Sequence, residues 1–177
     1  DGDGVRDPEE IGLEGVYVKV GGWAEITDAA GRFAAWNISP FEAIPIEIDT
    51  MAIADPRLVV LQPRVAVHAA PNSFLTVDLP VVMGAEVAGF LLLDGQTLAG
   101  APVEFRNLRT GTVITVMTFA DGGFYEVGVP PGEYEVGVPD MLLEELGATY
   151  VPLTISIPTG PAADEVQWDD LVVRLTR

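Results

Sequence analysis

Short runs of alternating apolar and polar residues follow one another along almost the whole chain. Residues 16–20 read V-Y-V-K-V, residues 23–27 read W-A-E-I-T and residues 44–48 read I-P-I-E-I. Alternation with a period of two, rich in β-branched and aromatic residues, predicts strands with one buried face. Glycine, proline and aspartate between the runs predict turns. The runs recur about every 8 to 12 residues, which is the spacing of a β-sandwich or barrel.

The same pattern predicts an all-β protein with one short helix. The helix is expected at Asp140–Leu146, because an aspartate begins this segment and Gly147 follows it. Pro45 favours an edge position for its strand. The remaining strands are predicted at residues 31–36, 58–61, 64–69, 74–82, 87–93, 102–107, 112–119, 123–129, 133–138, 150–157 and 166–175.

An internal repeat divides the chain in two. Residues 13–20 (L-E-G-V-Y-V-K-V) align with residues 98–105 (L-A-G-A-P-V-E-F) at an offset of 85. Residues 27–33 (T-D-A-A-G-R-F) align with residues 118–124 (T-F-A-D-G-G-F) at an offset of 91. The difference predicts a longer second hairpin around Arg109 to Gly111. Two tandem antiparallel sandwiches of seven strands each, residues 1–83 and 84–177, explain the repeat best.

The repeated positions predict structural roles. Gly31 and Gly122 lie where a turn needs a positive φ, and the phenylalanines two residues later, Phe33 and Phe124, are expected to fill the two cores. Thr27 and Thr118 are expected at strand ends just before the turn. We therefore assign none of these residues to catalysis.

Charge and composition exclude several partners and chemistries. The chain has 177 residues with 27 acidic and 9 basic side chains, a net charge of −18, one histidine and no cysteine. This acidity argues against nucleic acid and against anionic membrane surfaces. The lack of cysteine removes disulfides and thiol catalysis, and one histidine cannot build a multi-histidine zinc site. No apolar run reaches the roughly 18 residues that span a bilayer, so we expect no membrane insertion.

The sequence also predicts that the chain is not an enzyme. It contains no G-x-S-x-G, H-E-x-x-H, Walker or G-x-G-x-x-G motif. Asp169 and Asp170 are adjacent on a predicted strand, so their carboxylates would point to opposite faces. Glu144 and Glu145 are the other adjacent pair. His68 is predicted to face solvent or a hydrogen-bond partner from a strand.

The aromatic residues leave two interpretations open. Trp23, Trp36 and Trp168, together with the tyrosines, could form a platform on which sugars stack. Packing of Trp23 and Trp36 in or at the edge of the core is the favoured interpretation. Tyr134 follows a P-P-G-E corner, which predicts that its hydroxyl ties down a loop.

The two copies resemble known modules. The second copy contains V-A-G-F, a D-G turn, G-A-P-V, T-F-A-D-G-G-F and P-P-G-E-Y-E-V, and it resembles the carboxypeptidase-regulatory-like, or prealbumin-like, seven-stranded sandwich. The first copy, D-G-D-G-V-R-D-P-E-E-I-G-L-E-G-V-Y-V, resembles the calcium-binding B-type repeats of bacterial surface adhesins. The resemblance covers nearly the whole chain, weakly at residues 50–74. It implies a non-catalytic part of an exported protein.

The N-terminal segment also has the spacing of a calcium loop. An EF-type loop takes oxygen ligands from positions 1, 3, 5, 7, 9 and 12 and has glycine at position 6. Position 1 would fall two residues before the first residue here, which predicts a segment cut from a longer chain. Pro8 departs from the pattern, and a solvated acidic terminus is the alternative. The expected ligands are Asp1, Asp3, the Val5 carbonyl, Asp7 and Glu10, with Gly4 at the turn.

These observations predict a structural spacer or interaction module of a bacterial cell-surface, envelope or secreted protein. Its expected location is extracytoplasmic, and its expected partners are neighbouring domains of a larger chain or surface assembly. One alternative is a module that binds carbohydrate or protein through exposed aromatics or an edge strand. Another is an accessory domain of an outer-membrane usher or receptor or of an exported hydrolase.

Overall fold

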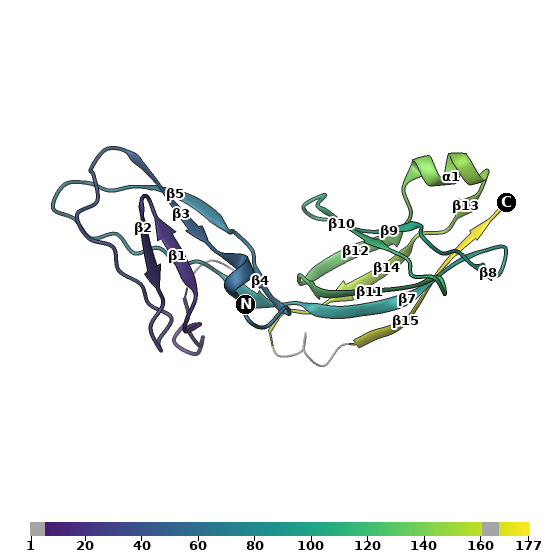
Figure 1. Cartoon of the computed structure of the whole chain (residues 1–177), viewed down its shortest axis with the longest axis horizontal. Coiled ribbons are helices and arrows are strands. Elements are labelled where there is room, and N and C mark those ends of the chain that lie inside the picture. Colours follow the sequence, from purple (N-terminus) through teal and green to yellow (C-terminus); the bar gives the residue numbers. More distant parts are fainter. Residues whose placement is uncertain (1–5, 161–166) are drawn as a thin grey trace. The chain divides into compact units, whose positions relative to one another are not determined.

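The chain forms two compact β-units joined in sequence. A computed structural model describes residues 6–160 and 167–177 (Figure 1). Unit 1 comprises Asp1–Val81 and unit 2 comprises Val82–Arg177. Each unit has its own cluster of buried apolar residues. The structure is therefore mostly β, as the alternating pattern predicted.

Unit 1 is built on a four-stranded antiparallel sheet in the order β2-β1-β3-β5. Alternate side chains of the central strands turn to one face, where Val18, Val20 and Ile46 are at most 5% exposed. This face carries the core of the unit because strand side chains alternate between faces. The strands are β1 (Tyr17–Val20), β2 (Trp23–Ile26), β3 (Ala43–Ile48) and β5 (Arg64–His68).

Among residues 6–81, the layer opposite this sheet contains almost no paired strand. Residues 31–36 and most of residues 74–82, which the sequence predicted as strands, form none. Their side chains still alternate, with Phe33 and Ala35 against the core and Arg32 and Trp36 exposed. The prediction is wrong because alternation reports a half-buried extended segment, whereas a strand also needs a neighbour to pair with. Unit 1 also contains η1 (Thr50–Ala52) and β4 (Leu58–Val60). β4 pairs with β6 (Val81–Met83), which begins at the last residue of unit 1.

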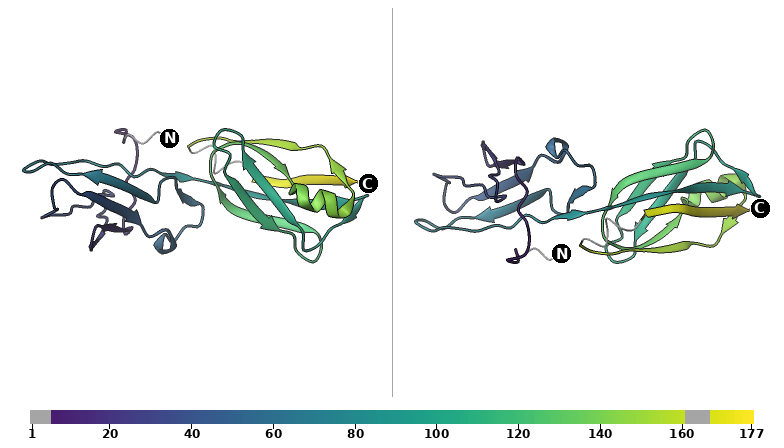
Figure 2. Two further views of the ribbon diagram at one scale, coloured as in Figure 1. Left: turned by 90° about the horizontal axis from the view of Figure 1, so that it is seen from above. Right: turned by 90° about the horizontal axis from the view of Figure 1, so that it is seen from below.

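Unit 2 has two complete sheets. One is four-stranded in the order β10-β9-β12-β14, and the other is five-stranded, with the order β11-β7-β15-β13 and β8 paired to β7. Figure 2 shows β15 beside β7 from two directions. The strands are β7 (Ala85–Leu93), β8 (Gln96–Thr97), β9 (Pro102–Asn107), β10 (Val113–Met117), β11 (Gly123–Val129), β12 (Gly132–Gly137), β13 (Thr149–Tyr150), β14 (Leu153–Ile157) and β15 (Gln167–Thr176).

The two sheets of unit 2 enclose one core. Phe105 on β9 and Phe124 on β11 meet edge to face with their ring centroids 5.9 Å apart. Val87, Val103 and Phe105 are completely buried. Because these side chains come from both sheets, unit 2 is a β-sandwich.

The expected fold class needs two corrections. β7 and β15 run parallel, so unit 2 is not wholly antiparallel. They begin and end the unit, and no hairpin fixes their relative direction. In the described residues unit 2 has seven strands of five to ten residues, plus β8 and β13 of two residues each. The part of unit 1 that the structure describes does not have the seven-stranded arrangement.

The predicted helix is present as α1 (Asp140–Leu146). It ends at Gly147, which adopts the left-handed conformation with φ 60° and whose N–H returns to the helix carbonyls. Leu142, Leu143 and Leu146 pack against the core of unit 2. The helix is therefore held by one apolar face, as its short length requires.

Candidate functional site

A corner built on a buried threonine occurs once in each unit. The Thr27 hydroxyl accepts the Val16 N–H at 2.9 Å and donates to the Leu13 carbonyl at 2.6 Å. The Thr118 hydroxyl accepts the Ala101 N–H at 2.9 Å and donates to the Leu98 carbonyl at 2.8 Å. Each threonine hydroxyl thus satisfies one backbone donor and one backbone acceptor in the segment just before β1 or β9.

The backbone bonds at the two corners also match. Gly15 N–H donates to the Thr27 carbonyl, and Gly100 N–H donates to the Thr118 carbonyl, both at 3.0 Å. Thr27 and Thr118 are 8% and 5% exposed. Each hydroxyl donates to one local backbone group and accepts from another, so it ties two chain segments together.

A glycine fixes the turn that follows each threonine. Gly31 and Gly122 have φ values of 71° and 79°, as the sequence predicted. A Cβ at Gly31 would lie 2.5 Å from the Gly12 Cα, and one at Gly122 would lie 2.5 Å from the Thr97 Cβ. Both the conformation and the close approach therefore require glycine.

The phenylalanine that follows differs between the units. Phe124 is 2% exposed and belongs to the core of unit 2, as expected. Phe33 packs against the core of unit 1 but is only partly buried. The local sequence is the same in both units, whereas the phenylalanine side chain is more completely buried in unit 2.

Tyr134 fills the predicted corner role. It is 2% exposed, and its hydroxyl donates to the Pro130 carbonyl at 2.9 Å. Burial raises the pKa of this phenol, and a hydrogen bond with Asn107 opposes that rise. The Asn107 side chain also accepts the backbone N–H groups of Arg109 and Thr110, which closes the longer β9–β10 hairpin. Tyr134 is thus a structural residue of unit 2.

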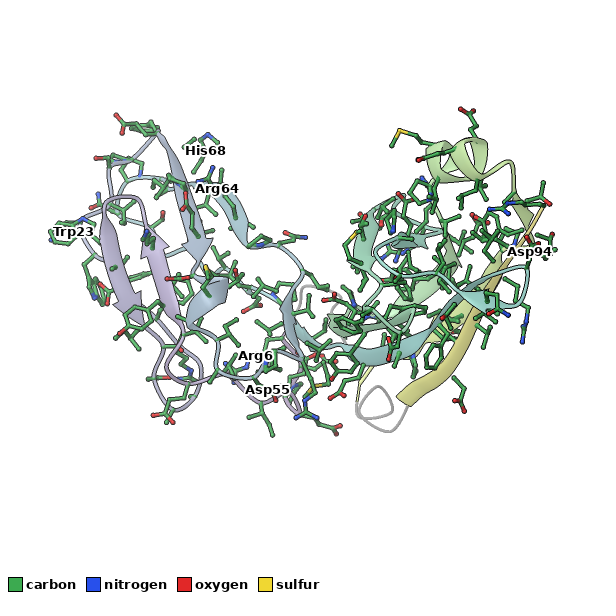
Figure 3. All side chains as sticks on the ribbon, turned by 45° about the vertical axis from the view of Figure 1, so that its right-hand side comes forward. Arg6, Trp23, Asp55, Arg64, His68 and Asp94 are labelled. Carbon is green, nitrogen blue, oxygen red and sulfur yellow. The ribbon has the colours of Figure 1, made fainter. Side chains whose placement is uncertain are left out.

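The expected packing of the two tryptophans of unit 1 is wrong. Trp23 and Trp36 are 66% and 68% exposed. Trp23 lies on β2 and projects outward in Figure 3, whereas Trp36 contacts Phe74, with the rings edge to face and 6.3 Å apart. Phe74 itself is 90% exposed. Trp23 thus lies on the four-stranded sheet, whereas Trp36 pairs with Phe74 in the segments that form no strand.

Other candidate residues show no converging arrangement. His68 lies at the end of β5 and faces solvent, as predicted (Figure 3). Glu144 and Glu145 are both exposed on α1. The side chain of Asp169 lies outside the described residues. Within the described ranges there is no group of three or more His, Cys, Asp or Glu side chains that could hold a metal ion.

The predicted calcium loop is described only in part. Asp1, Asp3 and Val5 lie outside the described residues. Asp7 and Glu10 belong to one turn, in which the Glu10 N–H donates to the Asp7 carbonyl and the Asp7 N–H donates to the Glu10 carboxylate, both at 3.1 Å. The Arg6 N–H donates to the Asp78 carboxylate at 3.4 Å. Two of the five expected ligands are therefore neighbours in space.

Two further carboxylates stabilise turns of unit 1. Asp28 accepts the N–H groups of Arg32 at 2.8 Å and Ala30 at 2.9 Å, and these bonds lower its pKa, the Arg32 bond most. Asp55 accepts two hydrogen bonds from the Arg57 guanidinium, which are the main cause of its lowered pKa. Sequence reasoning missed both, although aspartate two residues before a turn residue is a known signal for such bonds.

Comparisons with known proteins give structural neighbours only. No family model and no curated protein matches the sequence. The structure is similar to a streptococcal ancillary pilin (15% identity, TM-score 0.39, covering 95% of this chain and 59% of that one). It is also similar to GBS52, the minor pilin of Streptococcus agalactiae (13% identity, TM-score 0.44, covering 98% of this chain and 87% of that one). A third neighbour is the Bacillus anthracis TIE protein (14% identity, TM-score 0.36, covering 96% of this chain and 32% of that one).

A membrane-crossing helix is not found in the described part of the chain.

Proposed function

We propose that the chain is a non-catalytic spacer of a bacterial surface, envelope or secreted protein, made of two copies of one module in series. The observation that supports this most is the repeated corner, with the same threonine bonds and the same close-packed glycine in both units. A chain that repeats one compact β-module gains length without gaining a new site. The neighbours of such a spacer are further domains of the same assembly.

Stretching single molecules tests this proposal. Pulling on the two chain ends is expected to give two separate unfolding events. Fully extended chains of 81 and 96 residues reach about 290 and 350 Å, less the folded end-to-end distances. One event with the combined length would contradict two modules in series. An unrelated two-domain protein of known increments serves as the control.

The exposed aromatics of unit 1 support the alternative of a binding module. Trp36 and Phe74 form an exposed aromatic pair on the side of the unit that lacks a paired sheet. Titration of glycans with tryptophan fluorescence tests sugar stacking there. A saturable change that Trp36→Ala removes and Trp23→Ala retains would favour binding over a purely positional role.

We also propose that calcium binds the N-terminal loop through Asp1, Asp3, Val5, Asp7 and Glu10. The turn that joins Asp7 and Glu10 supports this, because carboxylate oxygens are the ligands that calcium prefers. The test is calorimetry on a chain extended by two residues so that an aspartate stands at position 1. Glu10→Gln is expected to abolish binding and Glu9→Gln to retain it. If calcium changes neither the heat nor the melting temperature, the loop is only a solvated terminus.

A further inference from the structure

β10 is an open edge of unit 2. Among the described residues it pairs with β9 alone. The phase of this pairing follows from the Thr118 N–H, which donates to the Ala101 carbonyl at 2.9 Å. Bonded and non-bonded residues alternate along an antiparallel ladder, so the even-numbered residues of β10 bond to β9. The N–H and C=O groups of the odd-numbered residues therefore point away from the sheet; these residues are Val113, Thr115 and Met117.

The other edge strands of the described residues each have a feature that discourages a further strand. Native proteins protect sheet edges with charged side chains, proline, bulges or short strands. β4, β6, β8 and β13 have only two or three residues, and β11 has a bulge after Val127. Charged side chains lie at Glu25 on β2 and at Arg64 on β5, while Pro152 and Pro158 bracket β14. β10 reads V-I-T-V-M and has none of these features.

The charges around β10 are placed symmetrically about Thr115. Residues 110–120 (T-G-T-V-I-T-V-M-T-F-A) carry no charge, in a chain with 27 acidic and 9 basic side chains. Arg109 lies six residues before Thr115 and Asp121 six residues after it, and both residues are exposed. When two copies of β10 lie antiparallel, the end of one copy that carries Arg109 meets the end of the other that carries Asp121. The charges that flank β10 are therefore complementary to themselves.

We infer that unit 2 pairs with unit 2 of a second copy of this chain through β10, with the two strands antiparallel and centred on Thr115. Thr115 then faces Thr115 of the second copy, and Val113 faces Met117 of the second copy. These are the residues whose backbone groups are turned outward, so each facing pair can exchange two N–H···O bonds. Opposed threonines are a favourable cross-strand pair. The contact is isologous, as in most symmetric dimers.

The uncharged stretch also explains how a chain with a net charge of −18 can pair with itself. The carboxylate beside Thr115 on β9 is Glu104, and Arg106 contacts it at 3.4 Å. In the paired sheets the two copies of β9 are three strand spacings apart, which is about 14 Å. The Debye length is about 8 Å at an ionic strength of about 0.15 M, so this repulsion is largely screened. Association should be weak, because one edge strand buries little area, and weaker still at low salt.

Sedimentation of the full chain over a rising concentration series tests the pairing. The parent chain is expected to form dimers at high concentration. Thr115→Lys sets two ammonium groups opposite each other and should weaken association about fivefold or more. The matched control is Thr154→Lys, which makes the same change at an exposed threonine on β14, the other edge of the same sheet. It should leave association unchanged, and equal melting temperatures show that both variants are folded.

Cross-linking tests the register, because the chain has no cysteine of its own. At a bonded pair the Cα atoms are about 5.5 Å apart, within the range of a disulfide, so Thr115→Cys should cross-link to itself with oxidised glutathione as oxidant. Val113→Cys should not, because the two Cα atoms of residue 113 would be about 13 Å apart. A mixture of Val113→Cys and Met117→Cys should form the mixed dimer.

Failure of this pairing would leave the spacer role intact. A chain that stays monomeric at every concentration would overturn the inference. Equal weakening by the two lysine variants would also overturn it, because added charge rather than the β10 edge would then be the cause. Val113→Cys that cross-links to itself as fast as Thr115→Cys would refute the antiparallel pairing centred on Thr115, since a parallel pair brings both residues onto their own copies.

Discussion

Unit 1 and unit 2 each contain a four-stranded sheet of the same strand order, β2-β1-β3-β5 and β10-β9-β12-β14, and they differ in the layer that covers this sheet. In both, a buried threonine and a left-handed glycine join the first strand to the turn after the hairpin. In unit 2 a five-stranded sheet closes the core, whereas in unit 1 residues 31–38 and 74–80 lie against the core without pairing. The two units thus have a four-stranded sheet of the same strand order, while more buried core residues are described in the unit that has a second complete sheet.

The larger buried core of unit 2 predicts that unit 2 is the more stable unit. Complete burial of a large apolar side chain contributes about 1.5 to 3 kcal/mol. Phe105, Leu91 and Leu175 are at most 1% exposed in unit 2. The large side chains of unit 1 are less completely buried, as Phe33 illustrates. Local unfolding should therefore begin in unit 1.

Truncation of a core phenylalanine should show the largest contrast between the units. Phe105→Ala is expected to cost about 3 to 5 kcal/mol, because it empties a completely buried site and removes the contact with Phe124. Phe33→Ala, at a partly buried site, is expected to cost about 1 to 2 kcal/mol. Urea unfolding, monitored by hydrogen exchange of peptides from each unit, measures the loss in free energy of unfolding for both variants. Equal costs would show that unit 1 has a core as tight as that of unit 2.

The parts of the fold that local sequence determines were predictable. The helix at Asp140–Leu146, the longer second hairpin, the Tyr134 corner and the positive φ of Gly31 and Gly122 all depend on residues close in sequence. The parallel pairing of β7 with β15 was not predictable, because it joins the two ends of a unit.

The missing pairing in the second layer of unit 1 escaped prediction for a related reason. Residues 31–36 alternate as strongly as a true strand, but pairing depends on a partner that period-two alternation does not report. The exposure of Trp23 and Trp36 was also not predicted, because large aromatic side chains are usually buried to a large extent. Of the candidate site, the sequence predicted Asp7 and Glu10 as calcium ligands, which stays a prediction, and it did not point to the turn-forming carboxylates of Asp28 and Asp55.

Substitution of Gly31 or Gly122 by alanine tests whether the two turns tolerate a Cβ equally poorly. Gly31→Ala and Gly122→Ala are each expected to cost about 2 to 4 kcal/mol, because the left-handed conformation and the close backbone approach both disfavour a Cβ. Gly111→Ala is the matched control, since its φ is 73° but no atom lies within 4 Å of the added Cβ. It should cost about 1 to 2 kcal/mol. Similar values for all three, read from thermal unfolding, would mean that the contact with Gly12 or Thr97 relaxes freely.

Removal of the buried hydroxyls tests whether the two threonine corners contribute equally to the stability of their units. Thr27→Val and Thr118→Val are each expected to cost about 1 to 3 kcal/mol, because the Val16 or Ala101 N–H and the Leu13 or Leu98 carbonyl lose their partner. Serine at either position keeps the hydroxyl and should restore most of the loss. Urea midpoints with unit-resolved exchange measure the effect. A large loss in one unit and none in the other would contradict the equivalence of the corners.

Acidification should reveal a smaller difference, in a turn of unit 1. The N–H of Arg32, followed by that of Ala30, holds the pKa of Asp28 below its usual value. Because the folded pKa is depressed, the stabilisation is present above the pKa of the unfolded chain and is lost as the pH falls through the folded pKa.

Asp28→Asn keeps an acceptor but removes the charge, so the variant should be slightly less stable than the parent chain at pH 7 and equal to it near pH 2. Asp28→Ala removes the acceptor as well and should be less stable at both pH values. Melting temperatures measured from pH 7 to pH 2 follow the convergence. A constant difference between the Asn variant and the parent across this range would show that the Asp28 charge contributes nothing to the turn.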